Sequence, residues 1–127
     1  MKFADLHVHS HFSDGTYSPQ HIVAEAIQKG LACISLTDHD STQGIEPALK
    51  AAKGDLEVLA GIELTAESAG HEIHILGYLI DHKNAQFLKM LKKMQEIRVK
   101  RIHAICEKLK KLGIALDNGQ RVSGHAC

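Results

Sequence analysis

The sequence predicts an α/β fold in which parallel strands are joined by crossover helices and are followed by one long helix. Short apolar segments alternate with amphipathic segments over residues 3–80. A single helical repeat of apolar residues then runs over residues 85–112. The chain has 127 residues, 44% of them hydrophobic, which suits one domain but not a complete large α/β barrel.

The first unit is predicted to be a strand, a helix and a second strand. Residues 3–8 read as a short strand and residues 32–37, ACISLT, as an apolar one. Between them, Ser18 is a good N-cap and Pro19 suits the first helical position. The helix is expected to run to about Lys29, because glycine follows and glycine commonly ends helices.

A second helix and two more strands complete the first part. The helix is expected over residues 43–53, and it is followed by a glycine. The segments LEVLAGIELT (56–65) and HEIHILGYLI (71–80) each contain a strand. The β-α-β-α-β order favours parallel pairing with crossover helices.

The long helix carries a stripe of apolar residues separated by Lys and Glu. The stripe consists of Phe87, Leu91, Met94, Ile102, Ile105, Leu109 and Leu112. Arg98 falls where the stripe predicts an apolar residue. We expect Ile97 to take the core position and Arg98 to reach water, although an arginine directed at a substrate phosphate fits the same position.

Composition excludes several classes of protein. Lys plus Arg and Asp plus Glu each number 15, so the formal net charge of zero gives no case for a nucleic-acid or membrane surface. There is no apolar run of the ~18 residues that a membrane span needs, and no signal peptide is expected. Cys33, Cys106 and Cys127 form no CxxC pair, which indicates neither a disulfide framework nor a zinc knuckle and favours the cytoplasm.

Candidate metal ligands occur at the end of the first strand. His7 and His9, in DLHVHS, are two residues apart, so both imidazoles point to the same face and can reach one metal ion. Two surface histidines are the alternative. Asp14 follows in a Ser-Asp-Gly turn, where it is either an ordinary turn residue or a carboxylate folded back over the strand end.

The second strand ends in a similar cluster, LTDHD. His39 is a candidate ligand, because α/β folds place their sites at the carboxyl ends of strands. Asp38 and Asp40 can orient ligands from behind, or either can be the N-cap of the following helix.

The last two strands supply a carboxylate and a histidine. Glu63 lies between apolar residues near a strand end, where burial is costly unless a cation compensates it. Glu67 is expected in solvent. His71 and His74 face opposite sides of their strand, and we choose His74, within the apolar run, as the ligand and place His71 at the solvent edge.

The sequence contains ten histidines. Those outside the clusters are expected to be exposed: His21, His82, His103 and His125. Ligand-type residues at four successive strand ends are difficult to explain by folding alone. No P-loop, Rossmann glycine pattern or Ser-His-Asp order competes with a metal site.

Together, DLHVHS, the SDG turn, LTDHD, GIE and HEIHILGY resemble the PHP (polymerase and histidinol phosphatase) superfamily. The wording SDGTYSP, TDHDSTQG and HILGY resembles its stand-alone metal-dependent phosphoesterase branch. The resemblance implies a distorted, TIM-like β/α barrel with two or three divalent metal ions, Mn, Zn or Fe, at its C-terminal face. It implies six ligands in this sequence: His7, His9, Asp14, His39, Glu63 and His74.

The resemblance also predicts how the chain is organised. Residues 1–82 would be the N-terminal portion of the metal-binding barrel, and residues 83–127 a helical insertion that is incomplete at its C-terminus. The family's later His-Pro and Asp-x-His motifs are absent, and the ending RVSGHAC resembles a loop within the insertion. We therefore expect uncovered strand edges and self-association.

The function implied by the resemblance is hydrolysis of phosphate esters on small nucleotides. Nucleoside 3′,5′-bisphosphates and the 5′ ends of short RNA are the expected substrates, and the chain itself is expected to be incomplete for activity. Two alternatives remain open. One is a non-catalytic metal-binding or assembly module, and the other is an amidohydrolase-type hydrolase of C–N bonds, which uses similar His-x-His strands.

Overall fold

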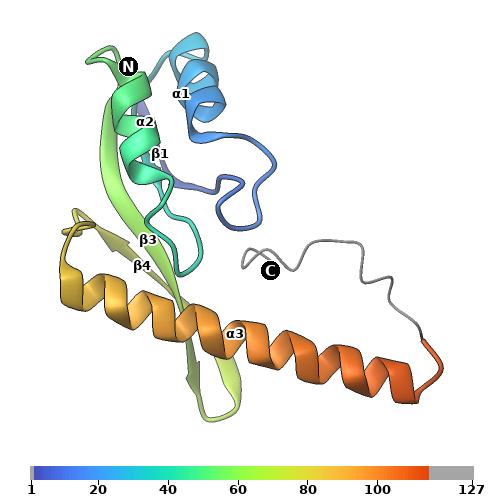
Figure 1. Cartoon of the computed structure of the whole chain (residues 1–127). Helices are drawn as coiled ribbons and strands as arrows, with labels where there is room; N and C mark the ends of the chain where they lie inside the picture. The colour runs from blue at the N-terminus through green and yellow to red at the C-terminus, as the bar shows by residue number, and fades with distance from the viewer. Residues whose placement is uncertain (1, 115–127) are drawn as a thin grey trace.

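The computed structural model of the protein describes residues 2–114. Figure 1 shows a curved sheet with two short helices on one side and a long helix crossing its far end. The elements are β1 (Phe3–Val8), α1 (Pro19–Gln28), β2 (Leu31–Leu36), α2 (Ile45–Ala52), β3 (Glu57–Ser68), β4 (His71–Tyr78) and α3 (Ala85–Lys111). The four strands form one sheet in the order β1-β2-β3-β4.

The α/β class is confirmed, but the parallel prediction holds for three strands only. β1 pairs with β2 and β2 with β3 in parallel, whereas β4 pairs antiparallel with β3. The reason is the connection, since only Ala69 and Gly70 separate β3 from β4. Both have positive φ, 52° and 80°, as in the tight turns that join antiparallel strands. A parallel return requires a crossover of a dozen or more residues.

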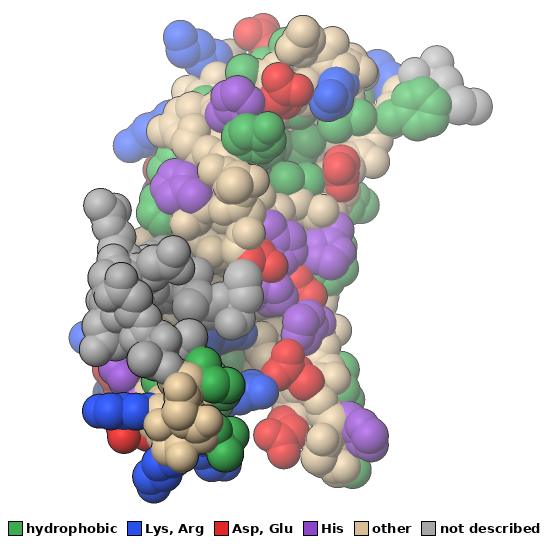
Figure 2. Space-filling model, turned by 90° about the vertical axis from the view of Figure 1, so that its right-hand side faces the viewer, with side chains coloured by type: hydrophobic (Ala, Val, Ile, Leu, Met, Phe, Trp, Pro, Cys, Tyr) green, Lys and Arg blue, Asp and Glu red, His purple; other side chains and the backbone are tan. Residues whose placement is uncertain are grey.

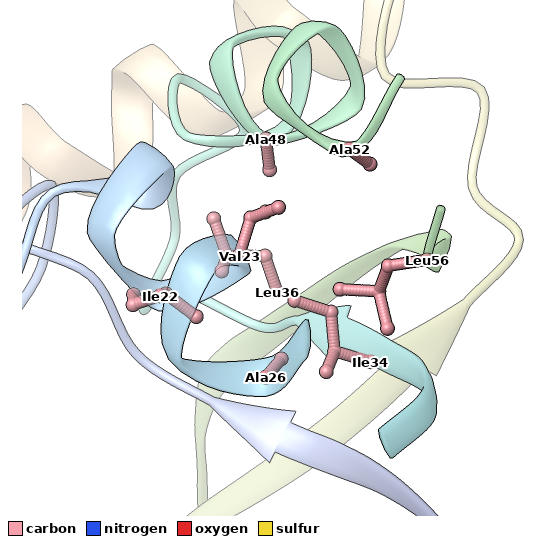
Figure 3. Packing of buried hydrophobic residues seen from close by; sticks show 8 residues of the cluster. All are labelled: Ile22, Val23, Ala26, Ile34, Leu36, Ala48, Ala52 and Leu56. Atoms are coloured by element: carbon pink, nitrogen blue, oxygen red, sulfur yellow. The ribbon is translucent and has the colours of Figure 1, made fainter. Parts of the chain in front are cut away.

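The hydrophobic core lies between the sheet and the helices α1 and α2 (Figure 3). Ile34 and Leu36 of β2 are both 1% exposed and point to the same side, because alternate residues of a strand share a face. The cluster consists of Ile22, Val23, Ala26, Ile34, Leu36, Ala48, Ala52 and Leu56. This packing fixes the central strand β2, whose carboxyl end leads into the LTDHD segment.

The predicted cap of α1 is confirmed. Ser18 is the N-cap, Pro19 begins the helix, and the Ser18 hydroxyl accepts a hydrogen bond from the backbone N–H of His21 at 3.2 Å. We expect Ser18→Ala to lower the free energy of unfolding by about 1 kcal/mol, because that N–H loses its partner. Urea denaturation measures the change. Ser68→Ala, at the exposed end of β3, is the control and should leave stability nearly unchanged.

The interpretation of Asp38 or Asp40 as a helix N-cap is wrong. The N-cap of α2 is Gly44, which makes no side-chain capping bond. Residues 41–44 separate Asp40 from the first residue of the helix, Ile45, so neither aspartate stands at the N-cap position. Asp40 accepts a hydrogen bond from the backbone N–H of Thr65 instead.

The long helix α3 matches the predicted range but buries little of its apolar stripe. Leu91 is 2% exposed, whereas Ile105 is 45% and Leu112 is 76% exposed. The expectation that Ile97 takes the core position and Arg98 reaches water is wrong in both parts. Ile97 is 58% exposed, because it lies on the outer side of the helix, and the guanidinium of Arg98 donates to the carboxylate of Asp40 at 2.8 Å. The helix is thus held against the sheet largely by polar contacts.

The isolated histidines behave as expected with one exception. His21 and His103 are exposed. His82 is half-buried, and its ring lies 3.0 Å from the Glu46 carboxylate, which also contacts Lys83. Hydrogen bonds from Lys83 and His82 lower the pKa of Glu46 to about 2. Residues 82 and 83 lie against Glu46 of α2, and the pattern of apolar residues in the sequence does not predict this contact. His125, Cys127 and the RVSGHAC segment lie outside the described residues.

Within residues 2–114, no helix is both long enough and apolar enough to cross a lipid bilayer. Cys33 is buried and Cys106 is half-buried, and both are free thiols.

Candidate metal centre

The six predicted ligands come together on one face of the sheet. His7 and His9 lie at the carboxyl end of β1, and His39 follows β2. Glu63 and His74 lie on the antiparallel pair of β3 and β4. Figure 2 shows histidine and carboxylate side chains gathered in the middle of this face. The expectation of a strand end is wrong for Glu63 and His74, which lie within β3 and β4, although both lie close to the histidines that follow β1 and β2.

Glu63 is the centre of the cluster, and its side chain is only 5% exposed. Its Oε2 lies 3.0 Å from His7 Nε2 and 2.9 Å from His9 Nε2. The same oxygen is 3.6 Å from His39 Nε2, while Oε1 is 2.9 Å from His74 Nδ1. Among the described residues, this carboxylate therefore faces four imidazoles and neither Lys nor Arg.

A second carboxylate, Asp14, faces the same rings from the loop after β1. Asp14 Oδ1 lies 2.8 Å from His9 Nδ1, and Oδ2 lies 3.7 Å from His39 Nε2. The His9 ring thus has one carboxylate at each nitrogen, Asp14 and Glu63. Asp14 belongs to the cluster rather than to an isolated surface turn.

The electrostatics of the cluster keep the carboxylates ionised and His39 neutral. Burial works to raise the pKa of Glu63, but the hydrogen bond from His7 and the nearby His39 outweigh it, so the pKa lies below its usual value. The pKa of Asp14 is lowered in the same way, with burial opposed by His9 and His39. Burial lowers the pKa of His39; Glu63 opposes this and His9 adds to it.

His74 differs from His39 because it is more exposed and has a second acidic neighbour. Its Nε2 lies 3.1 Å from Glu72 Oε1, and this hydrogen bond is the main reason that the pKa of His74 is raised. Glu72 in turn accepts a hydrogen bond from Arg101 of α3 at 3.0 Å. His71 is exposed, as expected.

Behind the cluster lies a buried polar network that sequence reasoning found only in part. Asp38, 2% exposed, accepts hydrogen bonds at 2.7 Å from the backbone N–H and the hydroxyl of Ser10 and from the hydroxyl of Ser13. The Ser13 hydroxyl is also 3.3 Å from His9 Nδ1. Asp38 was predicted to orient ligands, but Ser10 and Ser13 were missed. Their only signal is that they flank the candidate ligands His9 and Asp14.

Gly15 is required by space and not by backbone conformation. A Cβ at this position would lie 2.2 Å from the carbonyl oxygen of His9. We expect Gly15→Ala to lower the free energy of unfolding by about 1–3 kcal/mol, the usual effect of overpacking, because backbone must move. It should also weaken metal binding, since His9 and Asp14 lie on that backbone.

The control for Gly15→Ala is Gly70→Ala in the β3–β4 turn. Gly70 has φ +80°, and a Cβ there meets no atom within 4 Å. Backbone strain alone should therefore cost about 1 kcal/mol. Metal titration monitored by calorimetry should show a loss of affinity only for the Gly15 variant. Equal affinity in both variants would contradict a role for the Gly15 contact in shaping the centre.

The residues present fit divalent metal ions. Three groups have ligand atoms within 4.8 Å of one another: His7, His9 and Glu63; His9, Asp14 and His39; and His39, Glu63 and His74. The centroids of neighbouring histidine rings lie 4.7–5.0 Å apart. Protonation of all the rings would balance the negative charge of the carboxylates, but it would also place positively charged rings next to one another. Neutral imidazoles and ionised carboxylates are the forms that bind metal. A metal cation bound by these groups balances the carboxylates while the imidazoles stay neutral.

The family to which the chain belongs follows from its match to a known domain. The PHP domain matches residues 5–111, which includes all six candidate ligands. The chain belongs to the PHP domain family. Curated relatives agree: a 5′-3′ exoribonuclease of Haemophilus influenzae is 38% identical over 95% of this chain. A 3′,5′-nucleoside bisphosphate phosphatase of Chromobacterium violaceum is 36% identical over 91% of it.

Solved structures of other proteins share the fold. An amidohydrolase from Chromobacterium violaceum with bound sulfate and no metal has a TM-score of 0.82 and 34% identity over 89% of this chain. A candidate metal-dependent phosphoesterase from Bifidobacterium adolescentis has a TM-score of 0.79 and 32% identity over 87%. The chain spans less than half the length of these proteins: 47% of the Haemophilus exoribonuclease and 40% of the Chromobacterium amidohydrolase.

Proposed function

We propose that this PHP domain chain provides the metal-binding part of a phosphoesterase that acts on small nucleotides. The convergence of four histidines on the buried Glu63, with Asp14 beside them, carries the proposal. Relatives named as an exoribonuclease and as a nucleoside bisphosphate phosphatase support this reaction class. Nucleoside 3′,5′-bisphosphates and the 5′ ends of short RNA are the proposed substrates.

The proposed ligands are those of the three groups within metal-binding distance. Two or three ions of Mn²⁺, Zn²⁺ or Fe²⁺ match this donor set, because imidazole and carboxylate together suit these metals. When bound, such ions lower the pKa of a coordinated water and stabilise negative charge on a phosphoryl group. The ligands proposed are His7, His9, Asp14, His39, Glu63 and His74.

The chain's own residues prepare the site in two ways. The surrounding imidazoles keep Glu63 ionised against the effect of its burial, and burial keeps His39 neutral, so neither has to exchange a proton before binding metal. A cleft of about 490 Å³ between α3 and the β3–β4 hairpin adjoins the cluster and is lined by Asp40, Glu72 and Arg101 among others. It offers room for a substrate whose phosphate lies at the metals.

The test begins with metal content. Elemental mass spectrometry on the chain, purified without chelator or affinity tag, should find at least one equivalent of Mn, Fe or Zn that is absent from a His39→Ala variant. Phosphate release from adenosine 3′,5′-bisphosphate and trimming of a 5′-labelled short RNA are then measured with added Mn²⁺. Metal bound without turnover would favour the alternative of a metal-binding or assembly module for this chain. A chain that never binds metal would refute the proposal.

Hydrolysis of a C–N bond is the second candidate, supported by the amidohydrolase from Chromobacterium violaceum that shares the fold. Similar histidine pairs can serve both reactions, so substrates must separate them. Turnover of amide substrates without turnover of phosphate esters would favour this candidate.

The proposal also covers the division of the chain into parts, its self-association and its location. Residues 1–82 form the portion of the barrel that carries the metal centre, and residues 83–127 belong to a helical insertion. Self-association is expected at the outer edges of β1 and β4, where Phe3 is 61% and Ile75 is 52% exposed. Size-exclusion chromatography with light scattering tests this, and a compact monomer would contradict it. The proposed location is the cytoplasm.

A further inference from the structure

His39 is the candidate ligand whose ring lacks support from behind. Its Nε2 faces Asp14 and Glu63, whereas its Nδ1 is buried and, among the described residues, has no hydrogen-bond partner. Histidines that bind metals usually donate their second N–H to a carboxylate or carbonyl, which fixes the ring. The position of His39 must therefore be set by the backbone on which it stands.

That backbone is held through Asp40, the next residue. The Asp40 N–H donates to the carbonyl of Glu63 at 2.9 Å, and the Glu63 N–H donates to the carbonyl of Asp38 at 3.3 Å. Asp40 is 3% exposed and has φ +49°, a conformation that non-glycine residues adopt rarely and keep only where their surroundings enforce it. The contacts of Asp40 are thus what holds His39 opposite Glu63.

Those contacts come from two distant parts of the chain. Asp40 Oδ1 accepts the N–H of Thr65 at 3.0 Å, and Oδ2 accepts Arg98 Nη2 at 2.8 Å. The same nitrogen of Arg98 donates to the hydroxyl of Thr65 at 2.6 Å, and Gln95 donates to the carbonyl of Asp40 at 2.8 Å. Both Gln95 and Arg98 lie on α3, so the long helix holds Asp40 in place through hydrogen bonds.

We propose that Arg98 is a positioning residue that, through Asp40, sets the affinity of the metal centre. The inference rests on the proposed function, because it concerns the same site. Without the guanidinium, the buried Asp40 carboxylate loses its charged partner. An unpaired buried charge is strongly destabilising, so we expect Asp40 to move toward solvent. Movement of Asp40 moves His39, which belongs to two of the three candidate metal groups. By linkage, metal bound at His39 must in turn favour the docked position of α3.

The experiment compares Co²⁺ binding by four forms of the full chain: wild type, Arg98→Ala, Arg98→Lys and Lys100→Ala. Lys100 is exposed on the same helix and serves as the matched control. Chelator competition should show Arg98→Ala binding about 10–100-fold more weakly than wild type, the effect typical of lost outer-shell partners. Arg98→Lys keeps a cationic donor and should recover part of the affinity, while Lys100→Ala should equal wild type.

Two further readings separate positioning from plain stabilisation. The visible absorption of bound Co²⁺ should change in Arg98→Ala, because the geometry at His39 changes. Hydrogen exchange over residues 91–101 should slow when metal is added to wild type but not to Arg98→Ala. If Arg98→Ala does not fold, Gln95→Ala removes the second contact to Asp40 and should weaken binding several-fold.

The outcomes distinguish this inference from the proposed function. Arg98→Ala with wild-type Co²⁺ affinity and spectrum would overturn the inference alone, and a raised KM for the phosphate substrate in that variant would assign Arg98 to substrate binding instead. A loss of stability in urea with unchanged metal affinity would mark a purely structural contact. A wild-type chain that binds no metal would overturn the proposed function and this inference together.

Discussion

Replacement of Glu63 by glutamine is expected to abolish most metal binding by this chain. Glu63 belongs to two of the three candidate metal groups and is the carboxylate on which four imidazoles converge. Glutamine keeps the shape but loses the charge that a divalent ion needs. We expect the affinity to fall by more than about 100-fold, beyond the loss that an outer-shell partner causes. Any phosphate release that depends on metal should fall with it.

The matched control is Glu67→Gln, four residues along the same strand. Glu67 is exposed and belongs to none of the three metal groups, so it should keep the affinity of the wild type. Circular dichroism and urea denaturation of the apo forms establish that both variants are folded. A Glu63→Gln variant that is folded and still loads a full complement of metal would contradict the assignment of Glu63 as a ligand.

The sequence predicted which ligand-type residues lie close together better than it predicted the direction of the strands. A ligand-type residue such as Glu63 is recognisable locally, because a charged side chain is unusual within an apolar segment. The direction of β4 depends on a two-residue connection, Ala69 and Gly70, which the alternating pattern of strands does not report. Turn length, when read explicitly, contains that information.

The missed contacts share one cause, which is that each joins residues far apart in the chain. Ser10 and Ser13 look like ordinary turn residues until Asp38 is seen to lie against them. Arg98 breaks the apolar stripe of α3, and periodicity alone sends it to water. Its partner Asp40 lies on a different element, so only the folded chain brings the two charges to 2.8 Å. A polar residue that interrupts an apolar stripe, with no partner nearby in the sequence, is therefore a good candidate for a contact with a distant part of the chain.

Asp38→Ala is expected to destabilise the chain and to weaken the metal centre at the same time. Three donors from Ser10 and Ser13 bond this buried carboxylate. Alanine leaves the two Ser10 donors without this acceptor and the Ser13 hydroxyl with only longer contacts, such as the one of 3.2 Å to Asp14 Oδ1. The expected loss in the free energy of unfolding is about 3 kcal/mol or more, because bonds to charged groups are the stronger ones and the donors remain buried. Metal affinity should fall too, since the loop that these bonds hold carries Asp14.

Two controls make the Asp38 prediction specific, and both use urea denaturation followed by metal titration. Asp38→Asn keeps an oxygen that accepts from the Ser10 N–H and from Ser13, and its amide group can donate to the Ser10 hydroxyl. It should therefore retain most of the stability that alanine loses. Asp55→Ala, on an exposed turn, should match the wild type in both measurements. If Asp38→Ala were as stable as Asp38→Asn, these three hydrogen bonds would not be what holds the loop that carries Asp14.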